Sequence, residues 1–325
     1  MVEQARDVIL TVFMEGTANP MDAVTTQIAL FSKICVGEPL DAYEVSVRKA
    51  TPGSYKLSFP GCGVSHGLRG TLFAHGLREQ VGIVHRYLDA FIKAGNTIQV
   101  NFVGLSRGGI GGLYLAQELA CFSASQVVLN LLLFDPVPGN LVWMASFLDV
   151  AGQMNANQAM DVSSVKNLGR VEVLYPYEPL PAIAFHAPLL AKFPSGCNLR
   201  EDVILGCHQG ALFLHQRADT CLSFAMIRDF LEECGSSIDT NRQLARELNI
   251  SPKKMADLLS QELQHCVPSS RFAHAPVSGT QIVRHPKGQY LNRYHQALLQ
   301  RLGRSPPPNS DVADPLYMLA VQLPE

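Results

Sequence analysis

Residues 98–120 read IQVNFVGLSRGGIGGLYLAQELA, and this stretch decides the fold that the sequence predicts. Its apolar run breaks at Gly104-Leu105-Ser106-Arg107-Gly108, and apolar residues at helical spacing follow. This pattern predicts a strand, a sharp turn and a helix. The glycines on either side of the serine leave out side chains that would collide with the strand and the helix, as in a nucleophile elbow. The alternative explanation is a glycine-rich turn of an ordinary Rossmann-like sheet.

The composition is that of a globular protein with a large core. The chain has 325 residues, of which 47% are hydrophobic and 17% charged, so one α/β domain with a helical appendage fits better than two equal domains. The net charge of −2 gives no overall attraction to nucleic acid or to anionic lipid. We therefore expect no nucleic-acid partner.

The cysteines and the first residues bear on the compartment. The eight cysteines are scattered, with no C-x-x-C pair, which is typical of reduced thiols in a cytosolic fold. On the same ground we expect no metal, and we also expect no cofactor. Residues 1–16 contain an apolar run too short for a signal peptide or a membrane span. The sequence predicts a cytoplasmic fold, and export to another cell would have to use a different signal.

Other apolar runs predict the remaining strands of a mostly parallel sheet, and amphipathic segments predict its helices. The expected strands are 8–14, 55–59, 98–103, 127–134, 171–175 and 202–205, and the expected helices of this part are 21–33, 78–94 and the segment after Ser106. The chain then becomes helical, at 220–234, 241–248, 251–266 and 289–302. We therefore expect a core at 1–218 and a C-terminal helical region at 219–325 that caps the sheet or packs on it.

Polar residues at the carboxyl ends of these strands suggest a catalytic triad. Asp135 follows one strand, Glu178 follows the next, and His208 follows the last. The order Ser106, acid, histidine is that of the α/β-hydrolases, so the predicted fold class is an α/β-hydrolase-like sheet flanked by helices. Asp135 is the preferred acid, with Glu178 as the alternative; further candidates are Asp149 as the acid and His66 as a catalytic group. The competing explanations are a turn-capping Asp135 and a buried His208 bonded to a carbonyl.

The loop after the first strand is a candidate oxyanion hole. Gly16 and Thr17 are small, so their N–H groups can approach a ligand beside the N–H of Arg107. A simple turn before the helix is the alternative. The Arg107 side chain has two candidate roles as well, since it can bind a phosphate head group or pin the helix through an ion pair.

Several stretches together resemble one family. They are Phe13-Met14-Glu15-Gly16-Thr17 with Asn19, Phe59-Pro60-Gly61-Cys62-Gly63, Lys93-Ala94-Gly95, Gly104-Leu105-Ser106-Arg107-Gly108, Phe134-Asp135-Pro136-Val137 and Gly206-Cys207-His208. This order is similar to an uncharacterised α/β-hydrolase domain family that includes the first family of type VI secretion phospholipase effectors, bacterial proteins delivered to other cells. The chain differs from it at Glu15, where the family usually has aspartate.

The resemblance covers roughly residues 8 to 210. It implies Ser106 as nucleophile, Asp135 as acid and His208 as base. It also implies an acyl-ester substrate, with phospholipids or other lipids as the leading class, and hence transient contact with a membrane surface.

Two other functions compete with a serine esterase. One is a hydrolase fold without activity that acts as a binding protein. The other is a helix-turn-helix at residues 241–264, where Leu244, Ala245, Leu248, Ile250, Met255 and Leu258 fall at packing positions. Because Lys253 and Lys254 are followed by Asp257 and Glu262, a helical hairpin packed on the core fits this segment better than a DNA-binding face.

Overall fold

A parallel sheet of seven strands forms the centre of the fold. The computed structural model describes residues 6–17, 19–43, 45, 50–62, 76–139, 150–178, 188–208, 214, 218–265, 272–276, 280–284, 290–291 and 311–312. The strand order is β2-β3-β1-β4-β5-β6-β7, and every neighbouring pair is parallel. The strands are β1 (Val8–Met14), β2 (Glu38–Pro39), β3 (Gly53–Phe59), β4 (Ile98–Leu105), β5 (Val127–Phe134), β6 (Leu168–Glu178) and β7 (Asn198–Cys207).

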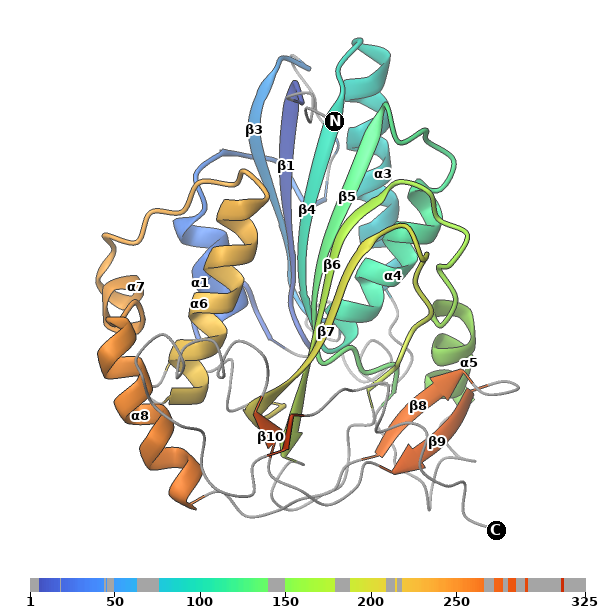
Figure 1. The fold of residues 1–325 in the computed structure, drawn as a ribbon. Coiled ribbons are helices and arrows are strands. Elements are labelled where there is room, and N and C mark those ends of the chain that lie inside the picture. Colours follow the sequence, from blue (N-terminus) through green and yellow to red (C-terminus); the bar gives the residue numbers. More distant parts are fainter. Residues whose placement is uncertain are drawn as a thin grey trace.

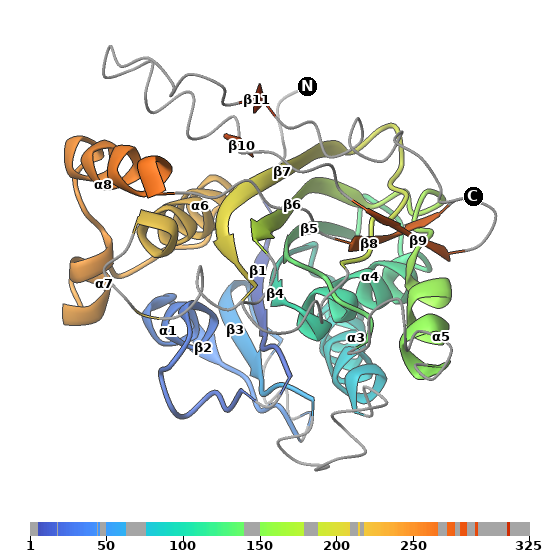
Figure 2. The ribbon, with the colours of Figure 1, turned by 90° about the horizontal axis from the view of Figure 1, so that it is seen from below.

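Helices cover both faces of this sheet (Figure 1). On one face lie α1 (Gln27–Ile34) and α6 (Ala218–Glu233), and on the other lie α3 (Leu77–Lys93) and α4 (Arg107–Leu119). Figure 2, seen from below, shows the sheet between these two layers, with α5 (Val150–Ala159) at the outer side of α4. The chain therefore has the three-layer α/β-hydrolase-like architecture that its sequence predicted.

Each central strand is buried on both sides because its alternate residues enter different cores. Phe102 of β4 packs in the core beneath α3 and α4, whereas its neighbour Val103 packs in the core beneath α1 and α6. Both side chains are fully buried, as are Leu131 and Leu132 of β5. The continuous apolar runs in the sequence follow from this arrangement, since no face of these strands meets water.

The strand register brings the functional turns to one edge of the sheet. Met14 pairs with Gly104, and Leu105 pairs with Phe134. The last residues of β1, β4 and β5 are therefore neighbours, and the turns that follow them share the lower edge of the sheet in Figure 1. This is where the expected nucleophile, acid and oxyanion loop all begin.

The helices after the sheet pack on the α6 side. Ala245 and Leu248 of α7 (Gln243–Leu248) and Met255 of α8 (Pro252–His265) are buried in the same core as α6. Leu244, expected at a packing position, is 42% exposed. The rest of α7 and the start of α8 therefore form a hairpin packed on the core.

Two helix predictions were wrong in part. The helix expected at 21–33 begins only at Gln27, because Thr26 is its N-cap and its side chain accepts a hydrogen bond from the Ala29 N–H. In the segment expected as a helix at 289–302, Tyr290 and Leu291 form β10, paired with β11 (Asp311–Val312); the remaining residues of that segment lie outside the described part. The strands β8 (Phe272–Pro276) and β9 (Thr280–Arg284) form an antiparallel pair that the sequence did not lead us to expect.

Candidate active site

The turn between β4 and α4 holds Ser106 in an unusual backbone conformation. Its φ is 56° and its ψ −117°, a region that residues other than glycine rarely adopt. The flanking glycines make this turn possible, because a Cβ on Gly108 would lie 2.3 Å from the Met14 carbonyl oxygen and a Cβ on Gly104 2.5 Å from the Gly108 carbonyl oxygen. The Ser106 hydroxyl does not cap the helix that it precedes. The local geometry is therefore that of the expected elbow.

The backbone of Ser106 is tied to the turn that follows β5. Its N–H donates to the Phe134 carbonyl oxygen at 2.9 Å, and its own carbonyl oxygen accepts from the Val137 N–H at 3.2 Å. These two bonds lie on either side of Asp135, which itself has a positive φ of 48°. The serine turn and the aspartate turn therefore form one rigid unit.

Asp135 and His208 are in direct contact. The Asp135 carboxylate and Nδ1 of His208 are hydrogen-bonded, and both side chains are buried. Because Nδ1 faces a carboxylate, a neutral His208 carries its proton on Nδ1 and leaves the Nε2 lone pair available as a base. The backbone of Ser106 is bonded to Phe134 and Val137, the residues on either side of this aspartate turn.

The loop after β1 lies against the serine turn. A Cβ on Gly16 would lie 3.0 Å from Leu105 Cγ and 3.4 Å from Ser106 Cβ, so this glycine allows close approach. The Gly16 N–H points at the Glu15 carboxylate at 3.3 Å, whereas the Thr17 hydroxyl accepts a hydrogen bond from the Arg107 guanidinium. The structure thus brings Gly16, Thr17 and Arg107 together near Ser106, although the Gly16 N–H already has an acceptor.

The Arg107 side chain is inside the protein. It is 2% exposed, and its guanidinium donates to Thr17. Burial raises the pKa of the nearby Cys62 thiol, and the Arg107 charge opposes this rise. A buried guanidinium that is hydrogen-bonded to the loop after β1 favours a role in holding α4 in place over the binding of a phosphate head group. The contact with the Thr17 hydroxyl joins α4 to the loop after β1.

Burial raises the pKa of Glu15 to about 7, against hydrogen bonds that lower it. The carboxylate accepts from the Gly16 N–H at 3.3 Å and from the Asn19 side-chain amide at 3.4 Å, and its other oxygen accepts from the Thr26 hydroxyl. In the sequence, Glu15 stood out only as a departure from a family pattern. The Thr26 N-cap was the one signal that could have pointed to this cluster.

Tyr175 and Glu201 form a second buried pair, which interacts electrostatically with Asp135. The Tyr175 hydroxyl donates to Glu201 at 3.1 Å, and burial, Glu201 and Asp135 together hold the tyrosine pKa well above its ordinary value. The tyrosine therefore stays protonated as a hydrogen-bond donor. No pattern in the sequence marked this pair, because a tyrosine in an apolar strand is most often a core residue.

Several candidates from the sequence cannot be placed. His66 and Asp149 lie outside the described residues, and Glu178 is described only as the last residue of β6, without its side chain. Among the residues that the structure does describe, no three His, Cys, Asp or Glu side chains are grouped so that they could hold a metal ion. In the same part of the chain, no helix combines the length and apolar character needed to cross a membrane.

A cavity of about 500 Å³ lies beside α1 and the edge strands β2 and β3. Lys33, Lys56 and Arg242 line it together with residues of β2 and β3, and none of Ser106, Asp135 and His208 does. The Lys56 ammonium donates to the carbonyl oxygens of Ser32 and Cys35 at 2.9 and 2.8 Å. This lysine therefore closes the carboxyl end of α1, which is a structural role.

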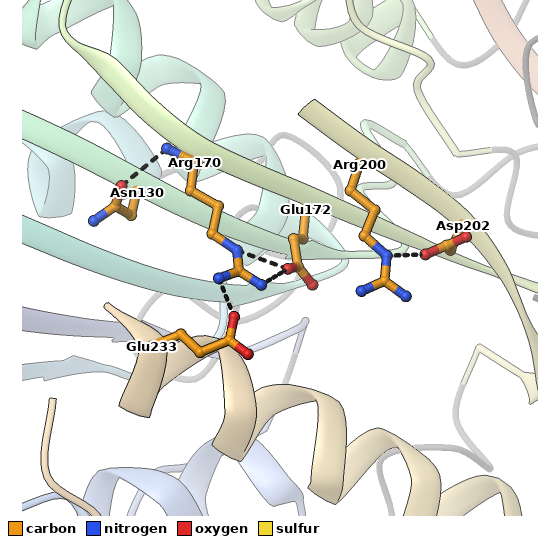
Figure 3. A network of polar contacts seen from close by, with 6 residues as sticks. All are labelled: Asn130, Arg170, Glu172, Arg200, Asp202 and Glu233. Carbon is orange, nitrogen blue, oxygen red and sulfur yellow. Dashed lines mark hydrogen bonds and ion pairs between the residues drawn. The ribbon is translucent and has the colours of Figure 1, made fainter. Parts of the chain in front are cut away.

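Figure 3 shows two further groups of charged residues, Arg170 with Glu172 and Glu233, and Arg200 with Asp202, which together we call the β6–β7 network. Arg170 donates through Nε to the buried Glu172 at 2.8 Å and reaches Glu233 at the end of α6. Arg200 pairs with the buried Asp202. Glu172 and Asp202 are thus paired with arginines, whereas Asp135 contacts His208 and Glu15 contacts an N–H, an amide and a hydroxyl.

Comparison with known proteins supports the fold alone. No protein-family model and no curated protein matches the chain. An uncharacterised protein from Pseudomonas aeruginosa is similar in structure, with a TM-score of 0.50 and 12% identity; the match covers 81% of this chain and 51% of that one. This chain thus corresponds to about half of that protein's length.

Two further solved structures are less similar. They are a proposed cell surface hydrolase from Lactobacillus plantarum, with a TM-score of 0.40 and 12% identity over 78% of this chain and 99% of that one, and Est1E from Butyrivibrio proteoclasticus, with a TM-score of 0.36 and 12% identity over 71% and 89%.

Proposed function

We propose that the protein is a serine hydrolase that cleaves carboxylic esters through Ser106, Asp135 and His208. The observation that carries the proposal is the contact of the Asp135 carboxylate with His208 Nδ1, together with a strained serine turn that is bonded to the backbone on either side of Asp135. Strain of this kind costs on the order of 1 to 3 kcal/mol and persists where the surrounding structure enforces it, often at functional sites. A buried histidine that only needed a partner would not require a strained serine turn whose backbone is bonded on either side of its aspartate.

The chemistry follows from the tautomer that Asp135 selects. Ser106 Oγ attacks the ester carbonyl carbon while its proton passes to Nε2 of His208. The imidazolium then gives this proton to the departing alcohol oxygen, which leaves an acyl group on Ser106. Water, deprotonated by the same Nε2, hydrolyses the acyl-enzyme and restores the serine.

The carbonyl oxygen becomes an oxyanion in both steps and needs N–H donors. Arg107 is the first residue of α4, and backbone N–H groups in the first turn of a helix point away from the helix and toward a ligand. The Gly16-Thr17 segment lies beside Ser106 and offers the second donor.

A lipid or phospholipid acyl ester is the substrate that we propose, with transient contact at the membrane surface. This class rests on the sequence resemblance described above. It predicts that esters of long acyl chains and phosphatidylcholine vesicles are better substrates than short soluble esters.

The test combines fluorophosphonate labelling with hydrolysis of p-nitrophenyl esters of short, medium and long chains. Wild type should be labelled and should turn over, whereas S106A should lose labelling and both S106A and H208A should lose about 10³-fold or more in kcat. A wild-type protein inert to probe, esters and vesicles would instead favour a binding protein on a hydrolase fold.

A further inference from the structure

Glu15 occupies the junction between β1 and the serine turn. Its side chain is 2% exposed, and its backbone N–H donates to the Phe59 carbonyl oxygen of β3 at 3.2 Å. Its own carbonyl oxygen would lie 2.8 Å from a Cβ on Gly108, so the backbone of Glu15 is packed directly on the first turn of α4. This residue is therefore held in place by the elements that form the site.

The Glu15 carboxylate connects both ends of the loop between β1 and α1. One oxygen accepts from the Gly16 N–H and the Asn19 amide, at the start of the loop. The other accepts from Thr26, whose hydroxyl oxygen in turn accepts from the Ala29 N–H and so caps α1. All three partners donate to the carboxylate, so the loop path depends on an acceptor at this position.

The path of this loop decides which N–H faces Ser106. Gly16 packs against the serine, since a Cβ on it would lie 3.4 Å from Ser106 Cβ, and its N–H is turned toward Glu15. The side chain of the next residue, Thr17, accepts a hydrogen bond from the Arg107 guanidinium. With the Gly16 N–H directed at the carboxylate, the N–H of Thr17 is the one left to act with that of Arg107.

The position is also costly to the fold, since burial of the carboxylate opposes its ionisation. No ion pair joins Glu15 to a basic side chain within the described ranges, in contrast to the equally buried Glu172. Ionisable groups whose burial works against their charge are typical of functional sites.

We propose that Glu15 is a positioning residue: its carboxylate holds the Gly16-Thr17 segment so that the Thr17 N–H, with the Arg107 N–H, receives the oxyanion formed on Ser106. This assignment rests on the proposed function and narrows the candidate donors from two loop residues to Thr17. Glu15 itself does not touch the substrate.

Two substitutions of similar size separate positioning from packing. Glu15→Gln keeps an acceptor for the Gly16 N–H and can donate to Thr26, so kcat should stay within about fivefold of wild type. Glu15→Met fills the same space without an acceptor and should lower kcat roughly 10- to 100-fold, which is less than the loss of about 10²- to 10³-fold for removal of an oxyanion donor because the Thr17 N–H is displaced and not removed. KM for p-nitrophenyl esters should change less than about threefold in both, because the interaction is made in the transition state.

A trifluoromethyl ketone with the acyl chain of the best ester gives an independent measurement. It forms a tetrahedral oxyanion on the serine, so its inhibition constant should rise in Glu15→Met by the same factor by which kcat/KM falls. Glu172→Gln is the matched control, being an equally buried glutamate outside the site, and it should leave both quantities unchanged.

The outcomes separate the two proposals. A folded Glu15→Met variant with kcat within twofold of wild type, or with loss confined to KM, overturns the role of Glu15 while the active wild type keeps the proposed function. An inert wild type overturns both. If Glu15→Met does not fold, Thr26→Val decides: a kcat several-fold lower at unchanged KM supports the proposal, and an unchanged kcat contradicts it.

Discussion

Buried carboxylates occur in two regions of the sheet, and their partners differ. In the β6–β7 network, Glu172 and Asp202 are paired with Arg170 and Arg200, so each negative charge has a permanent positive partner. At the carboxyl edge, Asp135 faces a histidine, and Glu15 faces only an amide, an N–H and a hydroxyl.

The two regions also differ in backbone strain. In the described ranges the non-glycine residues with positive φ are Ser106 and Asp135, both at the carboxyl edge. The charges of the β6–β7 network are compensated. The carboxyl edge of the sheet, in contrast, contains two strained residues and, at Glu15, a buried carboxylate without a basic partner among the described residues. A region that costs stability in two independent ways is the better candidate for chemistry.

The largest effect should come from Asp135→Asn. An asparagine can donate to Nδ1 and so favour the wrong tautomer of His208, which should lower kcat about 10³- to 10⁴-fold while the fold is kept. Steady-state hydrolysis of the best p-nitrophenyl ester measures this, with circular dichroism to check folding. A loss below about tenfold would mean that the Asp135–His208 contact is structural, and the contrast with the β6–β7 network would disappear.

The charge of Glu15 should appear in the pH dependence of stability. The pKa of Glu15 is about 7 in the folded protein against an ordinary value of 4.5, so the folded state holds the proton more tightly than the unfolded state. The contribution of this proton to the stability of the fold is complete below about pH 4.5 and is lost as the pH rises through 7. Between about pH 4 and pH 8, the free energy of unfolding of wild type should therefore fall by about 3 kcal/mol relative to that of Glu15→Gln. Urea denaturation of both proteins across this range gives the difference. Parallel curves would show that Glu15 is not buried as a charge.

The strain of the serine turn can be tested at its glycines. Gly108→Ala places a methyl group 2.3 Å from the Met14 carbonyl oxygen, a backbone atom that cannot yield without moving β1. We expect a loss of about 2 to 3 kcal/mol in the free energy of unfolding, at the upper end for overpacking. Gly196→Ala is the matched control, since nothing lies within 4 Å of its added Cβ, and it should stay within about 0.5 kcal/mol. Equal effects would show that the turn tolerates side chains.

The sequence allowed the sheet to be predicted closely, because its strands are buried on both faces and stand out as apolar runs. Each expected strand lies within an observed one, and β1 and β5 were predicted to the residue. The start of α1 was placed six residues early, because the loop before Thr26 contains apolar residues that do not belong to the helix. Ser106, Asp135 and His208 were chosen as candidates because each follows the end of a predicted strand. In a parallel sheet the strand register brings such ends to the same edge.

The role that we assign to Glu15 could not have been predicted in the same way. Its partners are an N–H, an amide and a hydroxyl from a loop and a helix cap, and their meeting depends on how the loop folds back over β1. A glutamate after an apolar strand is normally expected to be solvated. In the structure, its 2% exposure and its three hydrogen-bond donors distinguish it from an ordinary turn residue.

The smallest effect is expected from Glu172→Gln, and it is the sharpest control on the comparison. Glu172 and Glu15 are both 2% exposed, so the two positions differ in partners and not in burial. Because Arg170 keeps Glu233 as a second partner, loss of the Glu172 charge should cost only about 1 to 2 kcal/mol of stability. Its kcat should stay within twofold of wild type at every pH at which the variant is folded. A drop in kcat comparable to that of Glu15→Met would contradict a specific role of Glu15. It would show that loss of a buried glutamate elsewhere in the sheet lowers the activity to the same extent.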